Sequence, residues 1–168
     1  LTNISSLVIH ANQLTGEIPS EIGNLTNMGW LLLGGDLTGE IPSEIGNLTN
    51  LHRLGLSGQF SGIPSEIYSL ENLTNLSLNL SQFEGEIPSE IWNLENLTDL
   101  SLHGGFSGQI PPAIGNLDNL NRLWLSNNQL SGEIPIEIGD LTNLEWLVLN
   151  SNQLSGEIPT SIYNLTNL

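Results

Sequence analysis

The sequence predicts an α/β solenoid, in which short repeats stack into a coil with one parallel β-sheet. Two observations predict this fold. The stretch Leu-Thr-Gly-Glu-Ile-Pro-Ser-Glu-Ile-Gly-Asn occurs at 14–24 and again at 37–47, and weaker copies fill the chain at a period of 22–24 residues. Glycine and proline also recur at fixed offsets from the apolar positions. Self-similarity at this period is typical of a solenoid, whose repeats fold only by stacking on their neighbours.

Each copy contributes one short strand, and these strands are expected to stack in parallel on the concave face. The strand segments alternate, as in Leu7-Val8-Ile9 and Leu100-Ser101-Leu102. Period-two alternation is the pattern of a half-buried strand. The facing wall of the core is predicted to come from the column Leu14, Leu37, Phe60, Phe83, Phe106, Leu130 and Leu154, and from an isoleucine column running from Ile18 to Ile158.

The convex side is predicted to consist of turns and short 3-10 helix. A glycine column recurs in every copy, and a proline follows each of these glycines within three residues: Gly16, Gly39, Gly62, Gly85, Gly108, Gly132 and Gly156. Glycine suits a tight turn or a close backbone approach, and proline removes a donor that a regular central strand would need. These columns therefore have a structural role.

Seven copies begin at Leu1, Leu25, Leu48, Leu70, Leu94, Leu117 and Leu141, and Leu165 to Leu168 open an eighth. Their consensus, Leu-x-x-Leu-x-x-Leu-x-Leu-x-x-Asn-x-Leu-Ser/Thr-Gly-x-Ile-Pro-x-x-Ile-Gly-Asn, resembles the plant-type (24-residue) leucine-rich repeat family. The resemblance covers all 168 residues and predicts a single leucine-rich repeat array over 1–168. It implies a parallel sheet on the concave side and an extracellular or cell-surface location.

The ends of the chain carry no visible caps. Extracellular members of this family usually have paired cysteines in capping segments, whereas this sequence has no cysteine. Terminal repeats without polar caps expose core side chains. The sequence therefore predicts a fragment of a longer array, or a unit that associates end to end or with another chain.

Composition and spacing exclude several classes of function. Two cationic side chains stand against eighteen acids, a net charge of −16, so nucleic acid and anionic membranes are poor partners. No apolar run is long enough for membrane insertion. His10 and His103 share a column but stand four copies apart, about 19 Å, beyond the reach of a shared metal or a proton transfer. The chain is not expected to be an enzyme, and no catalytic residue, metal site or cofactor is predicted.

The candidate ligand-binding residues lie at outward strand positions of the predicted concave face. They are Trp30, Arg53, Asp99, Arg122, Trp124, Trp146, His10 and His103. Tryptophan and arginine are the residue types most enriched at binding hot spots. The alternative is pairing within the chain. Trp30 with Arg53 and Trp146 with Arg122 would form cation–π contacts, and Asp99 would form an ion pair with Arg122.

A turn asparagine follows the strand in three copies, at Asn12, Asn128 and Asn152, where its side chain is expected to bond the backbone of adjacent turns. The second, third and fifth copies are one residue shorter here, and Ser81 occupies the place in the fourth. We therefore expect this asparagine ladder to be interrupted, and the curvature to be irregular, through the middle of the array.

Eight glycosylation sequons, Asn-x-Ser/Thr, begin at Asn3, Asn24, Asn47, Asn72, Asn75, Asn79, Asn96 and Asn164. Most follow from the repeat itself, which reads Asn-Leu-Thr-Asn-Leu. Asn75 and Asn79 differ, because both lie on the outward face of one predicted strand. A glycan at either would cover the middle of the concave surface.

Three hypotheses for function remain. The first is a non-catalytic scaffold that recognises a protein, peptide or glycan through its concave face, as the resemblance implies. The second is a structural subunit, with or without glycans, of an extracellular filament or surface layer that assembles end to end. The third is ice binding, which requires a flat, regular array of small side chains, and the best candidate column is interrupted by acidic residues.

Overall fold

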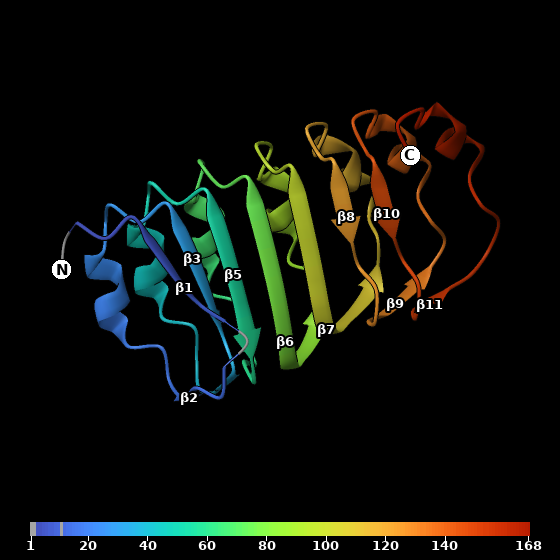
Figure 1. The fold of residues 1–168 in the computed structure, drawn as a ribbon. Helices are drawn as coiled ribbons and strands as arrows, with labels where there is room; N and C mark the ends of the chain where they lie inside the picture. The colour runs from blue at the N-terminus through green and yellow to red at the C-terminus, as the bar shows by residue number, and fades with distance from the viewer. Residues whose placement is uncertain (1–2, 11) are drawn as a thin grey trace.

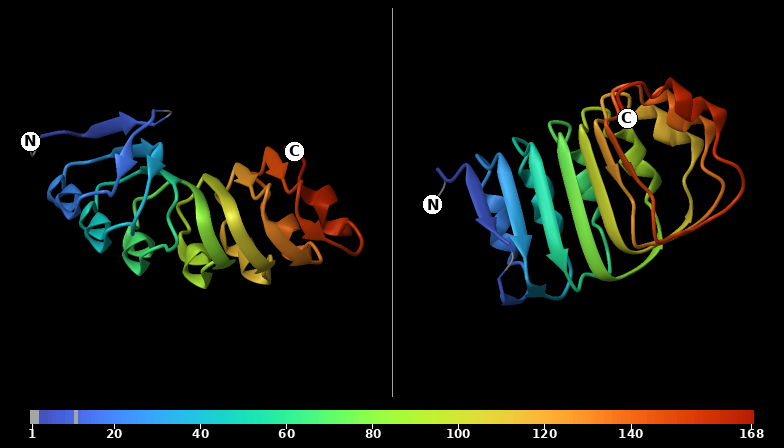
Figure 2. Two further views of the ribbon diagram at one scale, coloured as in Figure 1. Left: turned by 90° about the horizontal axis from the view of Figure 1, so that it is seen from below. Right: turned by 45° about the vertical axis from the view of Figure 1, so that its right-hand side comes forward.

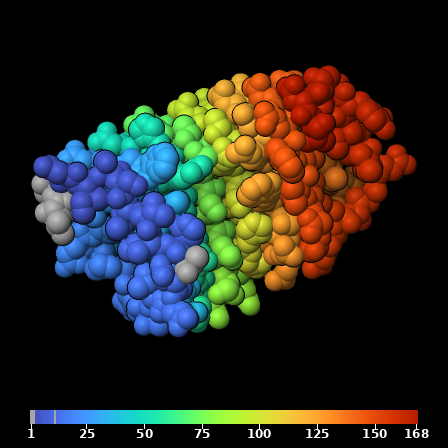
Figure 3. Space-filling view, in the orientation of Figure 1, coloured from blue at the N-terminus to red at the C-terminus, as the bar shows by residue number. Residues whose placement is uncertain are grey.

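A computed structural model describes residues 3–10 and 12–168, so Leu1, the predicted start of the first copy, lies outside the described residues. The chain winds into a solenoid with a strand on one side of each coil and a 3-10 helix on the other (Figure 1). The coils follow one another in chain order and appear as successive bands in the space-filling view (Figure 3).

In the described part of the chain, the concave face is a parallel sheet with strand order β1-β3-β5-β6-β7-β8-β10. These strands are β1 (Ser6–Ile9), β3 (Trp30–Gly34), β5 (Arg53–Gly58), β6 (Asn75–Glu86), β7 (Asp99–Gln109), β8 (Arg122–Trp124) and β10 (Trp146–Val148). The register pairs Trp30 with Arg53, and it pairs Arg122 with both Asp99 and Trp146. The columns predicted from the sequence are therefore the columns of the sheet.

A second row of short strands follows the first in the outer coils. It comprises β2 (Thr15–Gly16), which pairs with β4 (Asp36–Leu37), and β9 (Gln129–Gly132), which pairs with β11 (Gln153–Leu154). In the fourth and fifth copies the chain instead stays in one strand throughout, so β6 has 12 residues and β7 has 11. Continuous strand thus replaces the asparagine turn in these two copies.

The convex side consists of 3-10 helices, as predicted (Figure 2). They are η1 (Ser20–Asn24), η2 (Ser43–Asn47), η3 (Ser65–Ser69), η4 (Ser89–Asn93), η5 (Pro112–Asn116), η6 (Ile136–Asp140) and η7 (Thr160–Asn164). Each starts directly after a proline, whose fixed φ suits the position before a helix. Gly39 and Gly108, at φ 82° and 78°, form the tight turns that glycine tolerates best.

The core lies between the sheet and the 3-10 helices. Strand residues such as Leu78 and Leu102 are fully buried, and so is Phe60 of the facing wall. The rings of Phe83 and Phe106 pack 4.5 Å apart across neighbouring coils. Leu14 and Ile158, in the first and last full copies, are exposed. Burial is therefore greatest where a coil has a neighbour on both sides, as the stacking of repeats requires.

The predicted asparagine ladder is present at the C-terminal end of the array. The Asn128 Nδ2 donates to the carbonyls of Leu102 and Leu125, and the Asn152 Nδ2 donates to those of Leu125 and Leu149. Asn12, by contrast, is exposed and donates to His10 O within its own turn. Asn128 and Asn152 therefore connect coils, whereas Asn12 lies in the first described coil and bonds only within its own turn.

In the middle of the array, the pairing of β6 with β7 shifts register between Leu80 and Glu84. A Cβ at Gly104 would collide with Leu80 O, and a Cβ at Gly105 would collide with Phe83 O. These two glycines therefore allow the shifted backbones to approach one another.

A second asparagine ladder, which the sequence analysis did not predict, runs along the edge where the chain enters the strands. In six successive copies an asparagine Nδ2 donates to a backbone oxygen of the preceding copy, at 2.8 to 2.9 Å: Asn50 to Thr26, Asn72 to Thr49, Asn96 to Glu71, Asn119 to Glu95, Asn143 to Asp118 and Asn167 to Thr142. Each bond links two coils, so the ladder adds to the hydrophobic stacking.

Candidate ligand-binding face

The outward side chains of the sheet form three columns across the concave face. Strand alternation places them there, because in β7 Leu100 and Leu102 are buried while Asp99, Ser101 and His103 are partly exposed. Three large aromatic side chains stand on this face: Trp30 is 51% exposed, Trp124 is 40% and Trp146 is 56%. The fourth tryptophan, Trp92, is buried on the convex side. The exposed tryptophans are thus confined to the face predicted to bind.

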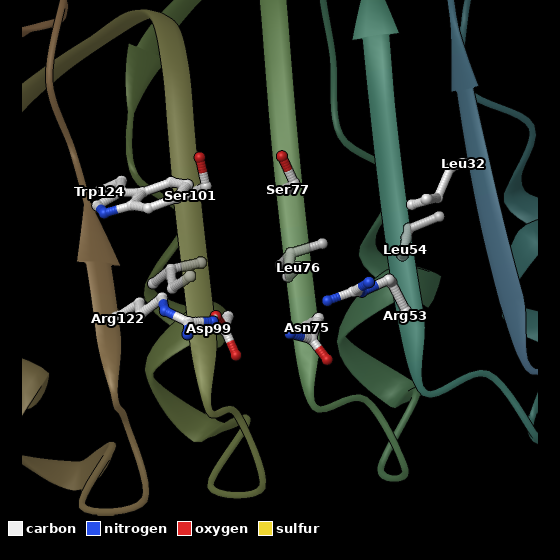
Figure 4. A pocket seen from close by; sticks show the side chains of 11 residues that line it. Leu32, Arg53, Leu54, Asn75, Leu76, Ser77, Asp99, Ser101, Arg122 and Trp124 are labelled. Carbon is white, nitrogen blue, oxygen red and sulfur yellow. The ribbon is translucent and has the colours of Figure 1, made fainter. Parts of the chain in front are cut away.

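A groove of about 270 Å³ crosses the middle of this face (Figure 4). One row of its lining is polar and comprises Arg53, Asn75, Asp99 and Arg122; the other comprises Leu32, Ser77, Ser101 and Trp124. Gly55 stands next to Leu32 in the second row, and a Cβ there would collide with the Leu32 side chain. The groove exists because small residues separate Leu32 from Trp124.

A second hollow of about 360 Å³ continues from the groove toward the ends of the strands. It shares Leu32, Ser77, Ser101 and Trp124 with the groove, and it adds His10 and His103 at its far side. The His103 Nδ1 is 2.8 Å from Ser126 O, which fixes the orientation of the imidazole. The two histidines therefore border one hollow although they lie four copies apart.

Some of the candidate residues interact with one another, as the pairing alternative predicted. The Arg53 guanidinium lies 5.4 Å from the Trp30 ring centroid, and the Arg122 Nη1 lies 2.9 Å from the Asp99 Oδ1. The predicted contact of Arg122 with Trp146 is not among the interactions of the described residues, because Arg122 turns toward Asp99. The ion pair is partly exposed, and such pairs contribute about 0–1 kcal/mol. These contacts orient the side chains more than they stabilise the fold.

The charge of this face differs from that of the whole chain. Both cationic side chains of the sequence, Arg53 and Arg122, lie on this face. Asp99 is the only acidic residue in the three outward columns. The chain as a whole, by contrast, has a net charge of −16. Within the described residues, no group of three or more His, Asp or Glu side chains is placed to hold a metal ion. The face presents cationic, hydrogen-bonding and apolar groups.

The candidate residues fall into three groups in space. The groove brings Arg53, Asp99, Arg122 and Trp124 together, and the second hollow adds the two histidines. Trp30 contacts this set through Arg53, while Trp146 stands beside it in the Arg122 column. Leu32, Ser77 and Ser101 were not among the residues predicted to bind a ligand. The feature of the sequence that could have indicated them is the run of small residues in the second outward column, which leaves room for a groove.

The sequon asparagines are mostly at the surface. Asn3, Asn24, Asn47, Asn72, Asn79, Asn96 and Asn164 are exposed, and Asn75 is half-buried. Asn75 and Asn79 both lie on the outward face of β6, as expected from the register. Asn75 lines the groove, whereas Asn79 lines the second hollow. A glycan at Asn75 would fill the groove itself.

A stack of short repeats with a parallel sheet on the concave side and 3-10 helices on the convex side defines a solenoid repeat protein. The family model described as Leucine Rich Repeat matches residues 3–25, 119–141 and 143–165. These segments include the three copies that keep the turn asparagine. The chain belongs to the leucine-rich repeat family, and its repeats are of the plant type.

Solved structures with similar folds include several receptor ectodomains. The plant peptide hormone receptor RGFR1, solved in complex with RGF2, is 39% identical with a TM-score of 0.92 over 100% of this chain and 28% of its own. The Arabidopsis receptor kinase HAESA, solved with the peptide hormone IDA and the co-receptor SERK1, is 41% identical with a TM-score of 0.85, over 95% and 27%. A leucine-rich repeat protein of Leptospira interrogans is 37% identical, with a TM-score of 0.84 over 99% and 42%.

The chain thus spans less than a third of the two plant receptors that it matches, and less than half of the bacterial protein. No curated protein sequence matches it. Among the described residues, no helix has the length and apolar character that crossing a bilayer requires.

Proposed function

We propose that the chain is a non-catalytic, extracellular or cell-surface recognition module that binds an extended peptide along its concave face. The observation that supports this most directly is the groove between Leu32 and Trp124. One row of the groove ends in the apolar side chains of Leu32 and Trp124, and the other row carries hydrogen-bonding side chains. The groove therefore suits a chain that presents an apolar side chain next to backbone amides. Arg53, Asn75 and Asp99 would bond that backbone.

The dimensions of the groove favour a peptide over a compact small molecule. Leu32 and Trp124 lie on β3 and β8, four strand steps apart, which corresponds to roughly 19 Å, or the length of about six extended residues. The groove and the second hollow, of about 270 and 360 Å³, are at or below the lower end of the roughly 300–1,000 Å³ typical of drug-sized sites. Each therefore matches a side chain or two rather than a bulky ligand.

The similar solved structures also support peptide binding. RGFR1 and HAESA were each solved with a peptide ligand, and this chain resembles part of each ectodomain. The proposal adds that the contacts lie within residues 32–124 of this chain. Trp124 is the leading anchor, because it lines both the groove and the second hollow and because tryptophan is among the residue types most enriched at binding hot spots.

The test is selection of random linear peptides displayed on phage against the purified chain. We expect enrichment of peptides that share an aromatic or aliphatic residue, and an affinity at least about tenfold weaker for the Ser77→Trp variant, in which the new indole fills the groove. Ser89→Trp, in the same copy but on η4 of the convex side, is the matched control and should bind normally.

Two outcomes would overturn the proposal. One is selected peptides that bind the Ser77→Trp and Ser89→Trp variants equally well. The other is the absence of any enriched peptide together with saturable binding to a glycan array, which would assign the exposed tryptophans to sugar recognition instead.

A further inference from the structure

The structure divides five of the glycosylation sequons into two groups that the sequence does not distinguish. In one group the asparagine ends a 3-10 helix: Asn24 ends η1, Asn47 ends η2 and Asn164 ends η7. In the other group, Asn72 and Asn96 lie three positions further along the repeat, in the second asparagine ladder. We call these the turn sequons and the ladder sequons.

The ladder sequons have their acceptor nitrogen engaged in the fold. The Asn72 Nδ2 donates to Thr49 O at 2.8 Å, and the Asn96 Nδ2 donates to Glu71 O at 2.8 Å. Asn50 and Asn119 occupy the same ladder on either side of this pair. The amide nitrogen that would carry a sugar therefore connects one coil to the next, between neighbours about 4.8 Å away.

The hydroxyl groups that complete the ladder sequons are engaged as well. The Thr74 hydroxyl donates to His52 O at 3.0 Å and lies 2.9 Å from the Asn75 Oδ1. The Thr98 hydroxyl lies 3.1 Å from Thr74 O and 2.9 Å from the Asp99 Oδ2. Both halves of each ladder sequon thus form part of the edge of the sheet.

The turn sequons are free of such bonds. Asn24, Asn47 and Asn164 are exposed, and their side-chain amides make no hydrogen bond to another described residue. The same holds for the hydroxyls of Thr26 and Thr49, which complete two of these sequons. A sugar on these asparagines would project into solvent without displacing a contact of the fold.

We propose that Asn24, Asn47 and Asn164 are N-glycan attachment sites and that Asn72 and Asn96 stay unmodified in the folded chain, an inference that rests on the proposed extracellular location. In the transfer, the asparagine Nδ2 attacks C1 of a sugar on a lipid-diphosphate donor. The new Nδ2–C1 bond replaces the C1–O bond, the lipid diphosphate leaves, and the amide gives up one proton to a base of the transferase.

Transfer to an extended chain would not by itself distinguish the two groups, so the selection acts at folding. A glycan on Asn72 or Asn96 leaves a single N–H on a nitrogen that must fit between two ladder neighbours. Such a chain loses the bond between coils or has to displace an adjacent asparagine. Since the repeats fold by stacking, molecules modified there fold less stably and are depleted from the secreted protein.

The test is site-by-site glycan occupancy of the whole chain secreted from insect cells. Occupancy is measured by mass spectrometry after release with a peptide N-glycosidase in heavy-oxygen water, which converts each glycosylated asparagine to a labelled aspartate. We expect most molecules to be modified at Asn24, Asn47 and Asn164 and few at Asn72 and Asn96. Equal occupancy in the two groups, greater occupancy of the ladder sequons, or an entirely unmodified secreted chain would each overturn the proposal.

A second measurement separates a folding effect from a local preference of the transferase. In unglycosylated protein made in bacteria, Asn72→Gln should lower the urea midpoint, whereas Asn24→Gln should leave it unchanged. Equal midpoints would contradict the structural reason for the division. When the peptide selection is carried out on this same unglycosylated protein, failure to bind peptides and failure of the glycosylation pattern are independent results.

Discussion

Replacing Asn128 with alanine should destabilise the array far more than the same change at Asn12, although the two occupy the same column of the repeat. Asn128 is 8% exposed, and its Nδ2 lies within hydrogen-bonding distance of the carbonyls of Leu102, Leu125 and Ser126. Asn12 is exposed and donates to His10 O at 3.2 Å. Comparing the two variants therefore separates the effects of burial and of contact between coils from the effect of residue type.

The size of the destabilisation follows from the hydrogen bonds that remain after Asn128 is replaced. Leu125 O still accepts from Asn152, and Ser126 O still has the His103 imidazole, but Leu102 O keeps no other side-chain donor. Loss of the buried hydrogen bond between coils costs about 1–3 kcal/mol, and loss of the two shared bonds adds roughly 1 kcal/mol. We expect Asn128→Ala to lower the free energy of unfolding by about 2–4 kcal/mol, and Asn12→Ala by less than about 0.5 kcal/mol.

The assay is urea denaturation followed by tryptophan fluorescence, with hydrogen exchange of the amides in β7 and β8 as a local readout. Repeat arrays depart from two-state unfolding, so the midpoints and local protection should be compared directly. Indistinguishable midpoints for the two variants, or unchanged exchange in β7 and β8, would refute the view that the buried ladder stabilises the stack.

Three further predictions concern packing. Leu102→Ala should cost about 2–5 kcal/mol and Ser101→Ala little, as judged by urea midpoints, because only the leucine is buried. Gly105→Ala should lower the melting temperature while Gly62→Ala does not, because a Cβ collides with Phe83 O at the first and meets open space at the second. Burial, with a smaller effect of Glu90, raises the pKa of Tyr68 above its ordinary value of 10.0, and its hydroxyl is buried without a partner. The stability that the protonated Tyr68 hydroxyl contributes is present below pH 10 and is lost as the pH rises. Tyr68→Phe should therefore keep or raise the urea midpoint at pH 7, and the midpoint of this variant should fall less steeply in alkali than that of the unchanged chain.

The features that repetition imposes could be predicted from the sequence. The strand register, the convex 3-10 helices and the buried columns all follow from apolar, glycine and proline positions that recur in every copy. The contacts of Arg53 with Trp30 and of Arg122 with Asp99 follow from the register as well, since neighbours in a column lie one strand spacing apart.

Features that depend on departures from the repeat were harder to predict. The length of β6 and β7 results from a missing turn asparagine, and the sequence showed the gap without showing that continuous strand fills it. The groove needs both the small residues at Gly55 and Ser77 and the orientation of Trp124, which no pattern specifies. Asn72 and Asn96 read as sequons, so their bonds to neighbouring coils were overlooked.

The position of the groove within the stack has a consequence for the binding-competent fraction of molecules. Its lining extends from β3 to β8, so coils on both sides of it take no part in contact with a ligand there. In a nearest-neighbour stack, outer coils open at lower free energy than central ones. An apparent Kd equals the intrinsic Kd divided by the competent fraction. Mild denaturant or heat should therefore open the flanking coils first and leave the affinity nearly constant, until the coils beneath the groove separate and binding is lost abruptly.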